Sequence, residues 1–255
     1  MPAVFSSHAN HARCLRFCRE LGIPVVVLAC LTYWLAAGGL DLAAERYFYY
    51  QGVGNGWPVG NLPLLRFLHD YGCWLALSMA IAGLIAGIAA IWARPLRRHW
   101  RAAVFFPLLM IIGPGLLVNS AFKNHWGRPR PSQIVEFGGT RPYSPPWRPT
   151  AYKQGVSFPS GHASMGFYLL SPYFLYRRRN MGLSLVWLAS GLLGGAVMGV
   201  MRMAQGGHFL TDVLWSGGVV YVTGWFLAAW LLRPPALTAI SRGERAGYNQ
   251  DQRCR

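Results

Sequence analysis

The sequence predicts an all-α protein, a bundle of six transmembrane helices, and three observations support this fold class. Of the 255 residues, 53% are hydrophobic and only 13% are charged, whereas a soluble domain usually has about a quarter charged residues. The apolar residues gather in long stretches, and the basic residues lie in short groups between them. Several of these stretches approach the roughly 20 residues that a membrane-spanning helix needs.

Six stretches qualify as spans: residues 21–40, 72–93, 102–122, 158–176, 183–202 and 208–232. The first follows three arginines and ends in small residues, as a cleaved signal peptide does, but its apolar part is long and favours a retained anchor. The last two are rich in Gly, and small residues allow membrane helices to approach closely. We therefore expect one compact domain over 21–235, between polar segments at 1–20 and 236–255.

The charge distribution predicts the partner and the orientation. A net charge of +16 suits either a nucleic acid or a membrane surface. Because the basic residues alternate with apolar stretches, we expect a lipid bilayer and no nucleic acid. With both termini cytoplasmic, 15 of the 24 Lys and Arg residues lie inside, as the positive-inside rule requires. Six of the other nine lie in the loop 123–157, which suggests an anionic partner on the outer side.

The five cysteines show neither paired spacing nor a metal-site pattern. Cys14 and Cys18 are four residues apart, but His8 and His11 nearby do not complete a known zinc spacing. We therefore expect free thiols and no metal site.

The first of three polar groups is KNHWGRPRP at 123–131. Lys123 ends the third span, and the helix should stop near Trp126–Gly127 because the two following prolines prevent its continuation. Lys123 and Arg130 then converge from a helix end and a rigid turn. The alternative is that both only anchor the helix end among lipid headgroups.

The second group is PSGH at 159–162, where the fourth span begins. Unpaired backbone N–H groups at a helix start can bind an anion, and Gly161 allows its close approach. The Ser160 hydroxyl adds a donor, and His162 lies in the first turn. The alternative is an ordinary Ser cap with an incidental His.

The third group is RMAQGGHFLTD at 202–212, which joins the last two spans. His208 and Asp212 are four residues apart and share a helix face. An Asp in a membrane helix is costly and suggests function. A carboxylate on one ring nitrogen would leave the other free as a nucleophile. The alternative is a buried His–Asp pair that holds helices together. In the six-span topology all three groups, including Arg202, lie at the same membrane face.

The order and spacing of these residues resemble the type 2 phosphatidic acid phosphatase family of membrane phosphatases. Met201 is a departure, because the family commonly has Ser before the third-motif Arg. The segments KNHWGR and EFGGT also look like the bacterial branch that includes lipid A phosphatases. The resemblance implies an inner-membrane enzyme with a periplasmic active site and no cofactor.

The resemblance also implies roles for these residues. His208 attacks phosphorus to form a phosphohistidine, Asp212 orients it, and His162 protonates the leaving oxygen and then activates water. The implied phosphate ligands are Lys123, Arg130, Ser160, Gly161 and Arg202. The three cations take the part that a divalent metal plays elsewhere.

Lipid A is the first expectation for the substrate, a phosphorylated lipid. Undecaprenyl pyrophosphate, phosphatidylglycerol phosphate and phosphatidic acid are alternatives, as are a phosphotransferase and, from another class, a transporter or scaffold. The oligomeric state stays open. We favour solvated loop positions over a substrate rim for Arg128, His125 and Glu136. Three further residues are candidates for contacting a second anionic headgroup: Arg141, Arg148 and Lys153.

Overall fold

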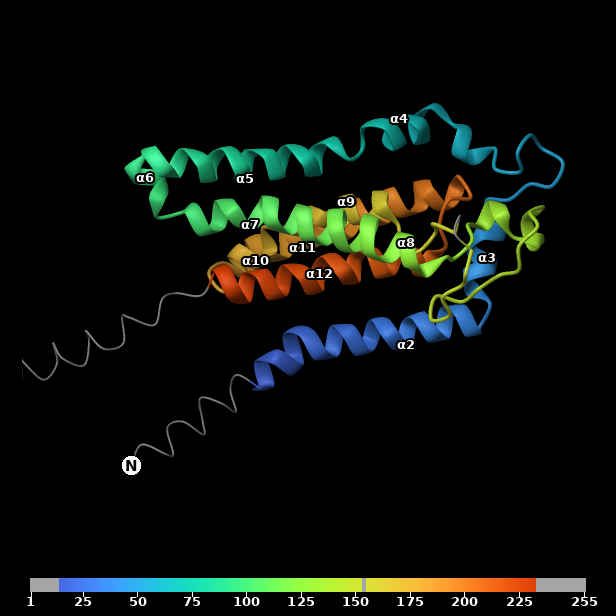
Figure 1. Cartoon of the computed structure of the whole chain (residues 1–255), viewed down its shortest axis with the longest axis horizontal. Helices are drawn as coiled ribbons and strands as arrows, with labels where there is room; N and C mark the ends of the chain where they lie inside the picture. The colour runs from blue at the N-terminus through green and yellow to red at the C-terminus, as the bar shows by residue number, and fades with distance from the viewer. Residues whose placement is uncertain (1–13, 153–154, 233–255) are drawn as a thin grey trace, which may run out of the picture.

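The computed structural model describes residues 14–152 and 155–232 of the chain. These residues form helices and loops (Figure 1), with a single isolated β-bridge between Ile134 and Arg141. The prediction of an all-α fold is confirmed for this part of the chain. The polar tail expected at 236–255 and most of the N-terminal segment expected at 1–20 lie outside the described residues, as does Lys153.

The helices, in chain order, are α2 (Ile23–Ala37), α3 (Leu40–Arg46), α4 (Pro63–Tyr71), α5 (Trp74–Trp92), α6 (Arg94–Arg97), α7 (Trp100–Met110), α8 (Lys123–Trp126), α9 (Gly161–Tyr168), α10 (Tyr173–Tyr176), α11 (Met181–Ala204) and α12 (Leu210–Leu231). Two π-helical segments, Cys18–Gly22 and Ile111–Phe122, precede α2 and join α7 to α8. Short 3₁₀ turns lie at Val59–Asn61, Pro131–Gln133 and Val135–Phe137.

Within the described residues, five helical segments are long and apolar enough to cross a membrane. They are Cys14–Ala37, Pro63–Trp92, Trp100–Gln133, Met181–Ala204 and Leu210–Leu231. Each overlaps one of the predicted stretches. Figure 1 shows these helices side by side, with α9 and α10 among them.

The remaining predicted stretch, 158–176, is a broken helix. It consists of α9 and α10, joined by a turn at 169–172. Pro172 has no N–H to donate to the carbonyl of Tyr168, so the α-helical hydrogen-bond pattern is interrupted there. Because α9 packs against α11 and α12 and is mostly buried, the break is enclosed by protein, where a membrane protein tolerates irregular backbone.

Glycines allow the close packing of α9 against α11. A Cβ atom on Gly166 would collide with the backbone of Gly194, and one on Gly195 would collide with the ring of Phe167. The predicted compact packing of Gly-rich helices is therefore found here. It holds α9, and with it the start of the helix at Gly161, in a fixed position.

The helix that carries Lys123 ends as the sequence predicts. Its last residue is Trp126, and Gly127 follows in the left-handed conformation with φ 69°. The loop beyond it folds back on this helix end: the Thr150 N–H donates to the Trp126 carbonyl at 2.9 Å, and the Ser157 N–H donates to the Arg128 carbonyl at 3.1 Å. The loop thereby places Ser157 directly before α9.

We predict that Gly166→Ala destabilises the protein by about 1–3 kcal/mol, the usual cost of overpacking a close contact. The added methyl group would force α9 away from Gly194. Thermal unfolding in detergent measures the change. Gly182→Ala is the matched control, because a Cβ there meets only one atom, at 3.6 Å, and Ala favours the helix. Equal stability of the two variants would contradict the packing argument.

Candidate active site

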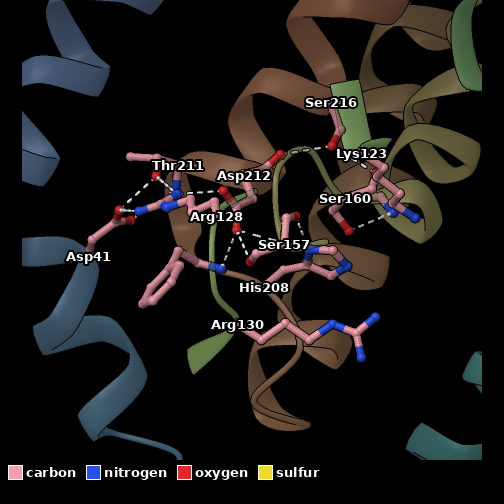
Figure 2. Close-up of polar contacts among 12 residues, drawn as sticks. Asp41, Lys123, Arg128, Arg130, Ser157, Ser160, His208, Thr211, Asp212 and Ser216 are labelled. Atoms are coloured by element: carbon pink, nitrogen blue, oxygen red, sulfur yellow. Dashed lines mark hydrogen bonds and ion pairs between the residues drawn. The ribbon is translucent and has the colours of Figure 1, made fainter. Parts of the chain in front are cut away.

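His208 is the centre of the site and lies between α11 and α12 with 2% of its surface exposed. Its Nδ1 atom is 2.5 Å from the Ser157 carbonyl oxygen. Because a carbonyl oxygen only accepts hydrogen bonds, Nδ1 carries the proton in this contact. The lone pair of the neutral ring is then on Nε2, and Figure 2 shows the ring between Ser157, Ser160 and Arg130.

The surroundings of His208 keep its ring neutral. Burial lowers the pKa of His208 well below its ordinary value of 6.5, and the positive charges of Arg202, Lys123 and Arg130 lower it further, against the opposing effect of the Ser157 carbonyl. At neutral pH the imidazole is therefore unprotonated. An unprotonated ring nitrogen under three cations can attack an electrophile that carries negative charge.

Two of those cations have unused hydrogen-bond donors. The Nε atoms of Arg130 and Arg202 are buried and have no hydrogen-bond partner among the described residues. Buried donors are seldom left unpaired, so such groups call for an explanation. A guanidinium group is suited to grip a phosphate or carboxylate through paired N–H bonds. The two side chains are thus prepared for an oxyanion.

Lys123 and the start of α9 form the other side of the site. Lys123 Nζ donates to Asn119 Oδ1 at 2.7 Å, which leaves two of its three N–H donors for other partners. A Cβ atom on Gly161 would lie 3.0 Å from Lys123 Nζ, so Gly161 allows the lysine to approach the helix start. Ser160 is the N-cap of α9, and its Oγ accepts from the Ala163 N–H at 3.4 Å.

His162 is half-buried in the first turn of α9 and stacks on His69 of α4. The ring centroids are 4.5 Å apart and the planes differ by 19°. His69 Nδ1 is in turn 3.1 Å from an Nη1 of Arg202, which also donates to Gln205 Oε1 at 2.5 Å. The sequence analysis missed His69; its position as a polar residue near the end of an apolar helix was the available signal.

Asp212 differs from the expectation that it contacts His208 directly. Its Oδ2 atom is 3.9 Å from His208 Nδ1, which is too far for a hydrogen bond. Oδ2 instead accepts from the Ser157 hydroxyl at 2.5 Å and from the Phe209 N–H at 2.9 Å. Asp212 therefore holds Ser157, and the Ser157 carbonyl holds the imidazole.

The preference for a solvated Arg128 is wrong, because its side chain has no exposed surface. One end of its guanidinium group pairs with Asp212, and the other pairs with Asp41 of α3 at 2.8 Å. Its Nε donates to the Ser144 carbonyl at 2.8 Å, and Thr211 Oγ1 accepts from its Nη1 at 2.9 Å. Between two buried carboxylates, the guanidinium group forms charge-assisted hydrogen bonds that it would not form if the side chain pointed from the loop into solvent.

Glu45 lies one helical turn after Asp41 and is also fully buried. Burial, together with the charges of Asp41 and Asp212, raises the pKa of Glu45 well above its usual range. The raised pKa favours the protonated, uncharged form of this side chain, which reduces the negative charge that Arg128 has to balance. Neither Glu45 oxygen has a hydrogen-bond partner among the described residues. The acidic pair at 41 and 45, next to the first span, was a signal that the sequence analysis did not use.

The other loop candidates lie at the edge of this arrangement. His125 is exposed and its Nδ1 contacts the Ala121 carbonyl at 2.7 Å, and Glu136 is exposed. Arg148 is exposed as well, whereas Arg141 lies 5.1 Å over the ring of Tyr152. A contact of Arg141, Arg148 or Lys153 with a second headgroup remains a prediction.

The fold and the site define a class of protein: a membrane enzyme with a neutral histidine beneath three cations, suited to phosphoryl transfer. The PAP2 superfamily model matches residues 102–235. The chain therefore belongs to the PAP2 superfamily and is a lipid phosphatase, a phosphoric monoester hydrolase.

Three relatives carry the name Lipid A 4'-phosphatase. That of Francisella tularensis subsp. novicida is 33% identical over 86% of this chain and 97% of its own length. That of Rhizobium leguminosarum is 32% identical over 56% of both chains, and that of Rhizobium etli is 35% identical over 41% of this chain and 40% of its own. No solved structure matches the chain significantly.

We predict that Arg128→Gln lowers the free energy of unfolding by roughly 3–5 kcal/mol, because it leaves two buried carboxylates without their cation. Thermal or denaturant unfolding in detergent measures the loss. Arg148→Gln removes the same charge from an exposed position of the same loop and should change stability by less than about 0.5 kcal/mol. A similar small effect for both variants would show that the buried bridge is not important for stability.

The lowered pKa of His208 predicts the acidic limb of the activity profile. Because the pKa of His208 is lowered, its ring stays unprotonated until the pH falls through that lowered value. As the pH is lowered, kcat/KM should therefore fall to half its maximum well below pH 6.5. The pH dependence of kcat/KM reports the ionisations of the free enzyme, and it can be measured by phosphate release from a short-chain lipid phosphate. An acidic limb centred at pH 6.5 or above would contradict this account of the His208 environment.

Proposed function

We propose that the protein removes the 4'-phosphate of lipid A through a phosphohistidine intermediate on His208. The observation that carries the proposal is the buried, neutral His208 facing the unpaired guanidinium donors of Arg130 and Arg202. The choice of the 4'-phosphate of lipid A is supported by the relative that is 33% identical over 97% of its length and bears the name Lipid A 4'-phosphatase.

In the first step, His208 Nε2 attacks phosphorus, an N–P bond forms, and the bond from phosphorus to the lipid oxygen breaks. Arg130, Arg202 and Lys123 hold the non-bridging oxygens, where negative charge is spread in the transition state. His162, protonated when the anionic phosphate binds beside it, gives this proton to the leaving oxygen, so that the lipid departs as a neutral hydroxyl. Ser160 and the Gly161 amide complete the phosphate cradle.

In the second step, a water molecule attacks the phosphohistidine. His162, now neutral, takes a proton from this water. The N–P bond breaks, its electron pair stays on His208 Nε2, and inorganic phosphate leaves. Asp212 acts as a positioning residue, because it holds Ser157, whose carbonyl fixes the ring of His208.

The three cations supply the positive charge that stabilises the transition state, and we propose that no metal ion takes part. The Asp212 carboxylate is occupied by Arg128, Ser157 and the Phe209 N–H, so it is poorly placed to ligate a divalent ion. The site lies at one end of the helix bundle, where a headgroup phosphate of a membrane lipid is found. We place this end at the periplasmic face of the bacterial inner membrane, with both termini in the cytoplasm.

The test presents the purified full-length protein, in buffer with EDTA, with lipid A, phosphatidic acid, phosphatidylglycerol phosphate and undecaprenyl pyrophosphate. We expect phosphate release from lipid A, with loss of the 4'-phosphate by mass spectrometry. His208→Ala should reduce release by at least about 10³-fold, the scale for loss of a catalytic nucleophile. An alkaline quench of enzyme with ³²P-labelled lipid A should trap labelled protein in the wild type but not in His208→Ala.

His125→Ala is the matched control, because His125 is exposed and contacts only its own helix among the described residues. It should keep wild-type rates. Equal phosphate release by His208→Ala and the wild type would contradict the role of His208 as nucleophile. Release that depends on His208 but comes only from another lipid would contradict lipid A as the substrate and still support the mechanism. Loss of activity in EDTA that Mg²⁺ restores would overturn the metal-free mechanism.

A further inference from the structure

A cavity of about 780 Å³ opens at the end of the bundle opposite His208. Its lining comes from three places: residues 97–102, residues 174–179 and the last turn of α12 with Leu232. Asp212 is in the first turn of α12, and Leu231 is its last residue. Helix α12 rises about 30 Å between them, which is the thickness of a bilayer core. Figure 1 shows α6, α10 and the end of α12 together at this end. The cavity therefore lies at the other membrane surface.

The rim of this cavity is strongly cationic. Two segments about 80 residues apart each contribute three guanidinium groups to the lining: Arg97, Arg98, Arg101, Arg177, Arg178 and Arg179. Glu20 is the carboxylate that pairs with this group in the described part of the chain, at 3.1 Å from Arg177 and 3.8 Å from Arg178. Six guanidinium groups in the lining of one cavity make it strongly cationic.

The rest of the lining is mostly apolar. It consists of Trp100, Ala102, Phe174, Leu175, Ala228, Leu231 and Leu232, together with His99 and Tyr176. Aromatic rings support two of the arginines, since Arg177 lies 5.3 Å over Phe174 and Arg101 lies 5.6 Å over Trp100. A ligand that fits both surfaces has an anionic head and an attached hydrocarbon part.

The positive-inside rule alone explains arginines at a membrane surface, but it does not explain their convergence on one partly apolar cavity. The chain itself offers one other occupant, residues 233–255, which follow the lining residue Leu232. These residues contain five Arg and two acidic residues, so their charge has the same sign as that of the cavity. Charge complementarity favours an anionic lipid instead.

We propose that this cavity binds the headgroup phosphate of an anionic phospholipid in the leaflet opposite the active site. The phosphate lies among the six arginines, and the acyl chains follow the apolar surface of α10 and α12 into the bilayer. This site is separate from the hydrolysis at His208 and does not depend on it. Basic pockets between membrane helices are a known way to hold such headgroups.

The test measures the binding of fluorescent phosphatidylglycerol to the purified full-length protein in a neutral detergent with phosphatidylcholine. The variant Arg98→Gln/Arg101→Gln/Arg178→Gln removes three lining charges. Each surface arginine contributes about fivefold to the affinity for anionic lipid, so the dissociation constant should rise on the order of 100-fold. The control Arg16→Gln/Arg19→Gln/Arg94→Gln removes the same charge from this membrane end outside the cavity lining and should change it less than about threefold.

The controls separate a lipid site from general surface charge and from a free phosphate site. Phosphatidylcholine should not compete with the probe, and glycerol 3-phosphate at millimolar concentration should not displace it. Equal weakening by the two triple variants, competition by phosphatidylcholine, or full displacement by glycerol 3-phosphate would each overturn the proposal. Should the triple variant fail to fold, Arg178→Gln alone replaces it, because this side chain is 51% exposed; a loss of about fivefold supports the site, and no loss overturns it.

Discussion

The ion pairs of Arg128 with Asp41 and Asp212 are the interaction on which the site depends. Arg128 is 87 residues from Asp41 and 84 residues from Asp212, so this one side chain fastens the N-terminal helices and the loop to α12. Asp212, held by Arg128, accepts a hydrogen bond from the Ser157 hydroxyl, and the Ser157 carbonyl fixes the ring of His208. A buried charge is tolerated only when it is paired, which makes this arrangement specific to one geometry.

The structure separates its negative charge from its positive charge around His208. Asp41 and Asp212 face Arg128, and burial and the neighbouring carboxylates raise the pKa of Glu45, which favours its uncharged form. Lys123, Arg130 and Arg202 are left facing the other side of the imidazole, where their charge lowers its pKa. A phosphate can then approach cations that have no salt bridge to a buried carboxylate in the described part of the chain, and the proposed nucleophile, His208, remains unprotonated. Fixed charges of this kind stabilise a transition state without rearranging when it forms.

The two ends of the bundle use arginine differently. At the active-site end, the Nε donors of Arg130 and Arg202 are buried and have no hydrogen-bond partner among the described residues, which suits a single compact anion. At the other end, six arginines surround a wider cavity with apolar walls. Both ends suit phosphate, but the first holds it beside a nucleophile and the second has hydrocarbon contacts in place of one. The same chemical preference would serve the proposed catalysis at one end of the bundle and the proposed lipid binding at the other.

The sequence by itself determined the all-α membrane fold, five of the apolar spans, the helix end at Trp126–Gly127 and the three motifs that indicated the family. These features depend on local composition, on the missing N–H of proline and on short spacings along the chain. The tertiary structure decided that α9 is enclosed by other helices, that Arg128 is buried, that Ser157 and not Asp212 contacts His208, and that His69 joins the site. Each of these depends on residues that are distant in the chain and meet only after the helices have packed, so no local pattern records these contacts, although the polar position of His69 was a local signal.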